Sequence, residues 1–186
     1  MAKYGLLGEK LGHSFSPQIH ARLADYDYAL MEKSPEEVEA FLKSGDFAGI
    51  NVTIPYKKTV IPFCAQLSPA AKKIGSVNTI VRRSDGSLYG DNTDYAGFMY
   101  MVKSSGAALA GKKALVLGDG GAACTVRAVL ADLGAGETVT ISRRGDNNYS
   151  NLDRHADAAV IVNATPVGMW PNTDASPLKK DQLEGC

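Results

Sequence analysis

Cysteine and histidine are scarce in this sequence. Its 186 residues contain three of each, and the cysteines (Cys64, Cys124 and Cys186) show no spacing typical of paired metal ligands. An odd number of cysteines argues against a disulfide framework, and the shortage of both residue types argues against a zinc site. We therefore expect reduced thiols in a cytoplasmic protein that has no metal centre.

Long hydrophobic runs and an excess of charge of one sign are also absent. No apolar run approaches the roughly 20 residues of a membrane span, and the first residues lead into a strand without a signal peptide. The 20 basic and 20 acidic residues give a formal net charge of zero, which argues against a broad surface for nucleic acid or anionic membranes. Hydrophobic residues make up 45% of the chain, as in ordinary globular proteins of one or two domains.

The chain is organised around residues 51–57, NVTIPYK. The β-branched residues in this region predict a strand over residues 48–54, which the following proline ends because it lacks an N–H. Asn51, Thr53 and Lys57 would then gather at the carboxyl end of a strand, where open α/β sheets bind their ligands. Lys57 could move a proton there; the alternative is a solvated lysine at the start of a surface helix.

Two serines precede the first predicted helix. A proline follows Ser16 at the first position of a helix expected over residues 17–25, with Ile19 and Leu23 on one face. Ser16 would be a good N-cap for this helix. The alternative is functional: the hydroxyls of Ser14 and Ser16, beside a helix N-terminus, would bind a carboxylate. Ser14 has no capping role in the expected helix, which favours that alternative.

Strands alternate with helices through the first half of the chain, which predicts a largely parallel sheet. Helix starts are marked by a serine and a proline at residues 34–35 and again at residues 68–69. Asp85 and Gly86 predict a hairpin turn. The strands of this half are expected at residues 3–8, 28–32, 48–54, 75–81 and 88–90.

Asp94 closes the motif DNTD just before a predicted helix over residues 95–105. It is either a first-turn acid that interacts with the helix dipole or a functional carboxylate. Phe98, Met101 and Val102 are spaced for contact with a core. We expect this helix to link two lobes, with the domain boundary near its end, in a small and polar segment.

A glycine-rich turn opens the second lobe. It follows an apolar strand at residues 114–117 and fits the pattern G-x-G-x-x-A at Gly118, Gly120 and Ala123. Gly118 would allow the tight turn, Gly120 would let the backbone approach a pyrophosphate, and Ala123 would let the helix pack on the strand. The helix N-terminus would face the phosphates, so we expect a bound dinucleotide.

The strand expected at residues 138–141 ends on Ser142, Arg143 and Arg144. An NAD site has an acidic residue at this position, whereas an arginine there suits the 2′-phosphate of NADP. The two arginines therefore predict NADP; the alternative is that both are solvated surface residues. The link that follows is too short for a full helix and strand before the apolar strand expected at residues 158–163.

Several motifs, taken together and in order, resemble the shikimate dehydrogenase family over nearly the whole chain. They are SFSP at 14–17, NVTIPYK at 51–57, VNT at 77–79, DNTD at 91–94, GDGGA at 118–122 and NAT at 163–165. The resemblance implies an α/β protein. Residues 1–103 would form a substrate-binding and catalytic lobe with a mostly parallel sheet, and residues 104–186 would form an incomplete Rossmann lobe that binds NADP.

The resemblance also implies an activity, the NADP-dependent interconversion of 3-dehydroshikimate and shikimate by hydride transfer at C3, in aromatic amino acid biosynthesis. On the substrate side it implies that Ser14 and Ser16 hold the carboxylate, that Thr53, Asn78 and Asp94 bind ring hydroxyls, and that Lys57 and Asp94 are the catalytic pair. On the cofactor side it implies Gly118, Gly120, Gly121 and Ala122 at the pyrophosphate, Ser142, Arg143 and Arg144 at the 2′-phosphate, and Thr165 and Met169 near the nicotinamide.

Three features depart from the family pattern. Asp119 puts an acid inside the glycine turn, where it should weaken pyrophosphate binding unless it points away. The link between residues 144 and 158 is short, so an outer strand is expected to be missing. The family continues further than this chain, so we expect a fragment or a short form with little dehydrogenase activity and a tendency to self-associate through the incomplete lobe. Two alternatives to a shikimate dehydrogenase remain: a binding module without turnover, and a quinate/shikimate dehydrogenase.

Overall fold

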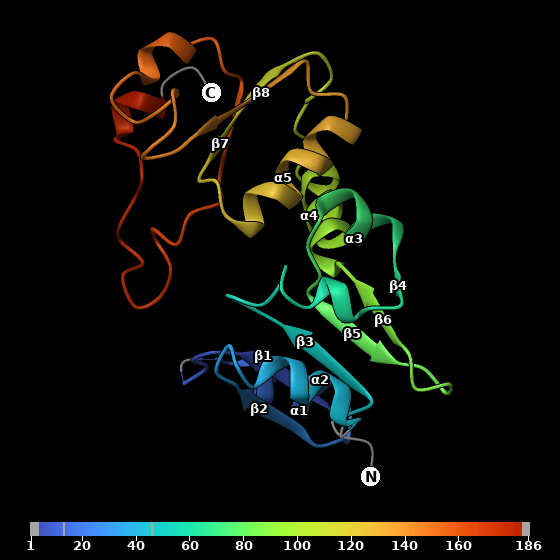
Figure 1. Ribbon diagram of the computed structural model, residues 1–186. Helices are drawn as coiled ribbons and strands as arrows, with labels where there is room; N and C mark the ends of the chain where they lie inside the picture. Colours follow the sequence, from blue (N-terminus) through green and yellow to red (C-terminus); the bar gives the residue numbers. More distant parts are fainter. Residues whose placement is uncertain (1–3, 13, 46, 184–186) are drawn as a thin grey trace. The chain divides into compact units, whose positions relative to one another are not determined.

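The chain forms two compact units, Met1–Thr93 and Asp94–Cys186. The structure is a computed structural model that describes residues 4–12, 14–45 and 47–183. Strands and helices alternate in both units (Figure 1), so the expected α/β class is confirmed. In the described part of the chain, no helix is long and apolar enough to cross a membrane.

The first unit is built on one six-stranded sheet. Its elements are β1 (Tyr4–Gly8), α1 (Ser16–Leu23), β2 (Tyr28–Glu32), α2 (Val38–Ser44), β3 (Gly49–Val52), η1 (Ile61–Phe63), β4 (Gln66–Leu67), α3 (Pro69–Ile74), β5 (Thr79–Arg82) and β6 (Leu88–Asp91). The strand order is β2-β1-β3-β5-β6-β4. Strand β1 is parallel to β2 and β3, β4 is parallel to β6, and β5 is antiparallel to β3 and β6. The expected mostly parallel sheet is therefore confirmed.

The strand register brings polar residues together near the carboxyl end of β3. Asn51 lies opposite Leu6 on the parallel neighbour β1 and opposite Thr79 on the antiparallel neighbour β5. The Val52 N–H donates to the Asn78 carbonyl at 2.7 Å. Strand β5 begins where the antiparallel strand β3 ends. Asn51 and Thr79, which are 28 positions apart in sequence, therefore become direct neighbours.

Alternation along β3 decides which side chains reach the core. Ile50 and Val52 are buried, whereas Asn51 between them is half-buried and points to the opposite face of the sheet. The core cluster of this unit contains Leu7, Val38, Leu42, Phe47, Ile50, Val52, Tyr56, Val60, Ala71, Val77, Ile80 and Leu88. The buried side chains of the core cluster therefore hold the sheet in place, while the positions between them along β3, such as Asn51, remain available for polar contacts.

The local signals for the starts of α2 and α3 and for the hairpin were informative. Ser68 caps α3 by accepting a hydrogen bond from the Ala71 N–H at 3.0 Å, as expected. The start of α2 lies later than expected, because residues 35–37 form a turn in which the Glu37 carboxylate accepts from the Ser34 N–H at 2.8 Å. Gly86 has φ of 83° in the hairpin turn. The two-residue strand β4 was not predicted, because so short a segment has no periodicity to recognise.

The expectation for the apolar face of α1 is wrong. Ile19 and Leu23 are 54% and 70% exposed, and the helix has no buried residue. The side of α1 that meets the sheet carries His20, whose ring stacks on Tyr28 of β2 with the ring centroids 3.7 Å apart. The proposed N-cap role of Ser16 is also wrong, because Ser16 is the first helical residue and the cap position falls on Phe15.

The second unit contains a three-stranded parallel sheet in the order β8-β7-β9. Its elements are α4 (Thr93–Ser105), β7 (Lys113–Leu117), α5 (Gly121–Asp132), β8 (Glu137–Ile141), η2 (Leu152–His155), β9 (Val160–Asn163) and η3 (Lys180–Leu183). Between β8 and β9 the chain forms only the short 3-10 helix η2. The expectation that this link lacks a full helix and strand is confirmed.

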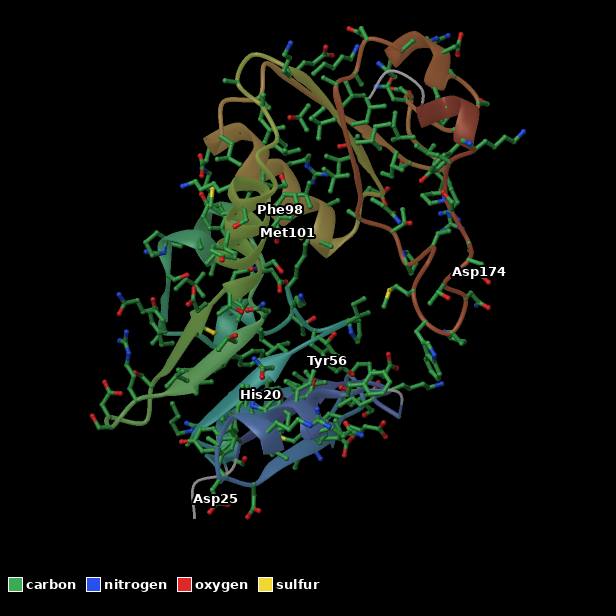
Figure 2. The ribbon with its side chains drawn as sticks, turned by 180° about the vertical axis from the view of Figure 1, so that it is seen from behind. His20, Asp25, Tyr56, Phe98, Met101 and Asp174 are labelled. Carbon is green, nitrogen blue, oxygen red and sulfur yellow. The ribbon has the colours of Figure 1, made fainter. Side chains whose placement is uncertain are left out.

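Helix α4 packs with the second unit, which explains where the chain divides. Phe98 and Val102 contact the core cluster that contains Ala114 and Val116 of β7. Met101 is 58% exposed, so its expected core contact is wrong; Figure 2 labels it beside Phe98. Because α4 shares a core with β7, the first compact unit ends at Thr93 and the second begins at Asp94. This division lies earlier in the chain than the domain boundary expected after residue 103.

Arg82 is expected to be the strongest polar contributor to the stability of the first unit. Its guanidinium donates to three backbone carbonyls, those of Leu42 at 2.8 Å, Phe47 at 3.3 Å and Gly86 at 2.8 Å, and lies over the Phe47 ring. Arg82→Met should lower the free energy of unfolding by about 2–4 kcal/mol, because three backbone carbonyls lose their charged donor and two of these bonds are partly buried. Urea unfolding would measure this loss.

Arg83→Met is the matched control for that measurement. Arg83 is exposed and its recorded contact is with the Tyr89 ring at 4.8 Å, so its replacement should cost less than about 1 kcal/mol. Equal losses for the two variants would contradict the role given to Arg82.

Candidate functional site

Ser14 and Ser16 form a pair of adjacent hydroxyls in front of α1. The Ser14 hydroxyl donates to the Ser16 hydroxyl at 3.1 Å and accepts from the Ser16 backbone N–H at 3.2 Å. Both residues are half-buried. The backbone contact gives Ser14 a local structural role that the sequence did not suggest, and it holds the two hydroxyls where one carboxylate could accept from both.

Tyr28, the first residue of β2, continues this polar group across the sheet. Its hydroxyl donates to Asn51 Oδ1 at 2.7 Å. Burial raises the pKa of Tyr28 to about 12, and the nearby Ser16 side chain offsets part of that effect. Tyr28 is therefore a neutral donor at physiological pH. Sequence reasoning missed it, because a tyrosine in a strand is an ordinary β-former.

Asn78 is held in one orientation by three donors. Its Oδ1 accepts from the Thr93 backbone N–H at 2.9 Å, from the Thr93 hydroxyl at 3.2 Å and from the Thr79 hydroxyl at 3.0 Å. The side chain is nearly buried, with 8% of the residue exposed. Because a backbone N–H can only donate, the atom facing Thr93 is the amide oxygen. The amide nitrogen, which also donates to the Thr93 hydroxyl at 3.1 Å, is thus left to meet a ligand hydroxyl with its second N–H.

Lys57 lies in a turn that the core holds in place. Residues 54–60 form turns, so the alternative of a surface helix starting at Lys57 is wrong. The neighbouring Tyr56, labelled in Figure 2, is fully buried and donates to the Lys33 carbonyl at 2.6 Å. The Lys57 carbonyl accepts from the Val77 N–H at 2.8 Å. Lys57 is therefore half-buried on a rigid turn next to the segment that carries Asn78.

Thr53 connects the end of β3 to β1. Its backbone N–H donates to the Leu7 carbonyl at 2.9 Å. A Cβ placed on Gly8 would lie 2.9 Å from Thr53 Cγ2, so the glycine at the end of β1 makes room for the threonine side chain. Thr53 thus stands at the same end of the sheet as the Ser14, Asn51 and Asn78 side chains.

Asp94 opens the second unit and is exposed. It directly follows Thr93, whose N–H and hydroxyl are bound to Asn78. Lys57 belongs to the first unit, so the pairing of Lys57 with Asp94 stays a prediction. The structure does bring Asn51 and Asn78 together with Tyr28, Thr79 and Thr93 in one hydrogen-bonded group. Ser14 and Ser16 form a separate hydrogen-bonded pair, and Ser16 is near enough to Tyr28 to affect its pKa.

The glycine turn of the second unit leaves open space in front of α5. Gly118 has φ of 103°, and a Cβ there would lie 3.1 Å from the Ala164 carbonyl oxygen and from Thr165 Cγ2. Gly120 occupies the N-cap position with φ of −76°. A Cβ at Gly120 or Gly121 would meet nothing within 4 Å. The helix N-terminus therefore has room for a pyrophosphate and free N–H groups to bind it.

Basic residues follow β8, beside this turn. Ser142 is nearly buried, and its N–H donates to the Asn147 carbonyl at 3.1 Å, while Arg143 and Arg144 are exposed. The pKa of Tyr149 is raised by burial, lowered by Arg143 and raised by Asp119. Asp119 and Arg143 thus act on the same tyrosine hydroxyl, which puts the unusual acid of the glycine turn within electrostatic range of the arginine predicted for NADP.

Thr165 and Met169 lie in the loop that follows β9. The Thr165 hydroxyl and N–H donate to Asn163 Oδ1 at 2.6 and 3.0 Å. Met169 is exposed. Because Thr165 Cγ2 is close to Gly118, the loop stands beside the glycine turn. Among the residues that the structure describes, no group of three or more histidine, cysteine or acidic side chains could hold a metal ion.

Known proteins resemble this chain in sequence and structure. The family model for the shikimate dehydrogenase substrate binding domain matches residues 6–80. A shikimate dehydrogenase (NADP(+)) of Clostridium beijerinckii is 37% identical over 200 residues, which cover 97% of this chain and 74% of that protein. Shikimate dehydrogenase 1 of Peptoclostridium difficile has a TM-score of 0.87 at 37% identity, covering 100% of this chain and 75% of that one. The Thermus thermophilus enzyme, solved in complex with NADP(H) and shikimate, has a TM-score of 0.82 at 32% identity, covering 98% and 75%.

Proposed function

Because this chain belongs to the shikimate dehydrogenase family, we propose that it interconverts 3-dehydroshikimate and shikimate by NADP-dependent hydride transfer at C3. The observation that carries this proposal is the polar group at the end of β3, in which hydrogen bonds join Tyr28, Asn51, Thr79 and Asn78, together with the hydrogen-bonded pair of Ser14 and Ser16. A small ligand with a carboxylate and several hydroxyls suits this arrangement.

The substrate side of the proposal assigns one chemical task to each group. Ser14 and Ser16 would donate to the carboxylate, while Thr53, Asn78 and Asp94 would bind the ring hydroxyls. The fixed orientation of the Asn78 amide supports this assignment, because its nitrogen is the atom left to meet a ligand oxygen. Polar groups held in this way need little further ordering when a ligand binds.

The catalytic step requires a proton donor at the C3 oxygen. Bound NADPH would supply the hydride to C3, and the carbonyl π electrons would move to the oxygen. Lys57 would stabilise the negative charge on that oxygen and transfer an ammonium proton to it, which forms the hydroxyl of shikimate. Asp94 would orient the amine and help to hold its proton.

The cofactor side uses the second unit. Gly118, Gly120, Gly121 and Ala122 would line the pyrophosphate, and the open space in front of α5 supports this. Ser142, Arg143 and Arg144 would bind the 2′-phosphate of NADP, while Thr165 and Met169 would lie near the nicotinamide. The proximity of Thr165 to Gly118 supports a single cofactor site that includes both loops.

Arg143→Ala should weaken NADP(H) by about 10-fold to 100-fold, because a charge-assisted contact of this kind contributes roughly 1.5–3 kcal/mol. NAD(H) lacks the 2′-phosphate and should bind almost as before. Isothermal titration of both cofactors would measure the difference, with the exposed Arg154 replaced by alanine as the control. Equal weakening of both cofactors would remove the argument for NADP.

The direct test of function is to mix the protein with shikimate and NADP⁺ and to follow the formation of NADPH by absorbance. Turnover supports the dehydrogenase. Binding of shikimate and NADP⁺ without turnover would instead support the module that binds both ligands but catalyses nothing. A parallel assay with quinate separates a shikimate enzyme from a quinate/shikimate dehydrogenase. The absence of both turnover and shikimate binding would contradict the proposal.

We further infer self-association through the second unit and a cytoplasmic location. Strands β8 and β9 pair only with β7 within the described residues, which leaves both outer edges open to another chain. Light scattering on the purified protein would show a single monomer mass if the inference of self-association is wrong.

The inference of a cytoplasmic location rests on the cysteines. The free thiols of Cys64 and Cys124 suit a reducing compartment such as the cytoplasm.

A further inference from the structure

The Thr93 backbone N–H determines which way hydrogen bonds run through the substrate side of the site. This N–H donates to Asn78 Oδ1 at 2.9 Å, so the Asn78 atom there is an acceptor. The Thr79 hydroxyl lies 3.0 Å from the same oxygen and must therefore donate its single proton to it. Thr79 can then only accept from any third group.

The donor and the acceptor of each of the other hydrogen bonds in this group can then be assigned in turn. Asn51 faces the Thr79 hydroxyl at 3.4 Å and must present its Nδ2 as the donor. Asn51 Oδ1 then faces Tyr28, which donates to it at 2.7 Å. That bond uses the one Tyr28 proton, so Tyr28 can only accept from any further group. Apart from this series of bonds, Ser16 accepts from Ser14 at 3.1 Å.

We propose that Thr79 is a positioning residue that connects Tyr28 and Asn51 to Asn78. Through its hydroxyl, a chain of hydrogen bonds runs in one direction from Tyr28, by way of Asn51, to Asn78. The inference rests on the proposed function for its ligand, a hydroxylated carboxylate. Thr79 lies opposite Asn51 in the pairing of β5 with β3, and this cross-strand contact joins the two parts of the group.

The chain of bonds makes the Asn78 amide depend on Tyr28. Bonds in such a chain polarise one another, so the loss of the first donor weakens those that follow. A change at the Tyr28 hydroxyl would therefore alter the surroundings of the Asn78 amide, provided that the Thr79 hydroxyl is present.

The first experiment measures shikimate affinity by isothermal titration of the full chain. Thr79→Val keeps the shape of the side chain but removes its hydroxyl, and should weaken binding by about 10-fold because Asn51 and Asn78 each lose a half-buried hydrogen-bond partner. Thr79→Ser restores a hydroxyl and should bind within about 3-fold of the original protein. Thr59→Val, at an exposed position, is the control and should change nothing.

The second experiment separates positioning from simple structural support. The side-chain amide signals of Asn78, assigned by their loss in Asn78→Ala, are recorded by NMR on the ¹⁵N-labelled chain. Tyr28→Phe removes the donor to Asn51, and should shift the Asn78 signals in the original background but leave them unmoved in the Thr79→Val background. Thr79→Ser should restore the response.

The two measurements distinguish the inference from the proposed function. The inference about Thr79 would be overturned, whatever the protein binds, by either of two results. In one, Tyr28→Phe shifts the Asn78 signals equally with and without the Thr79 hydroxyl; in the other, it does not shift them at all. If the original protein does not bind shikimate but the Asn78 signals respond as described, the proposed function is contradicted and the connection stands.

Discussion

Lys57→Met is expected to lower kcat for the oxidation of shikimate by about 10²-fold to 10⁴-fold, the usual contribution of a positioned proton-transfer group. The affinity for shikimate should change less, because Ser14, Ser16 and Asn78, the residues proposed to bind the carboxylate and a hydroxyl, are unchanged. Methionine keeps most of the aliphatic stem, so the half-buried turn around Lys57 should keep its packing. The measurement is steady-state turnover with NADP⁺, together with titration of shikimate binding.

Lys58→Met provides the matched control for that experiment. Lys58 is the next residue in the same turn but is exposed, so its replacement should leave both kcat and affinity nearly unchanged. If kcat of Lys57→Met stays close to that of the original protein, Lys57 is a binding residue and another group must transfer the proton.

Gly120→Val is expected to weaken NADP(H) by about 10²-fold or more without lowering the melting temperature. A side chain at this position meets nothing within 4 Å in the protein, and φ of −76° suits any residue. The new side chain would instead fill the space through which a pyrophosphate would approach the N–H groups of α5. Each hydrogen bond to a charged group that is lost there costs about 1.5–3 kcal/mol, or about 10-fold to 10²-fold in affinity. Thermal unfolding and cofactor titration measure the two effects separately.

Gly118→Val should behave differently from Gly120→Val. Its φ of 103° strains a residue with a Cβ, and the added atom would lie 3.1 Å from the Ala164 carbonyl oxygen. We expect a loss of stability of about 1–3 kcal/mol in addition to the loss of cofactor. Unchanged NADP(H) affinity in Gly120→Val would show that the pyrophosphate binds elsewhere.

Local signals in the sequence were sufficient for most elements of the fold. The β-branched residues around Ile50, the serine cap of α3 and the turn at Gly86 each depend on neighbours only a few residues away, so their structures follow from backbone preferences. The same holds for the glycine turn at Gly118, whose conformation few residues other than glycine can adopt. The motifs that carry the site were recognised for this reason.

Signals based on helical spacing were less reliable. Ile19, Leu23 and Met101 all have the spacing of core residues but are exposed. A short helix can expose an apolar face when another contact sets its rotation, and in α1 that contact is the stacking of His20 on Tyr28. Such a contact joins residues on different elements, and hydrophobic spacing within one element does not include it.

By itself, the sequence determined the α/β class, the order of the elements and the residue types available for chemistry, because each of these depends on local preference and pattern. Only the tertiary structure decided that α4 packs with the second unit, and that Tyr28, Asn51, Thr79 and Asn78 form one group. Hydrogen bonds join Tyr28 to Asn51 across 23 positions and Asn51 to Thr79 across 28. The register between strands determines contacts at such separations, and register depends on how the whole sheet packs on its core.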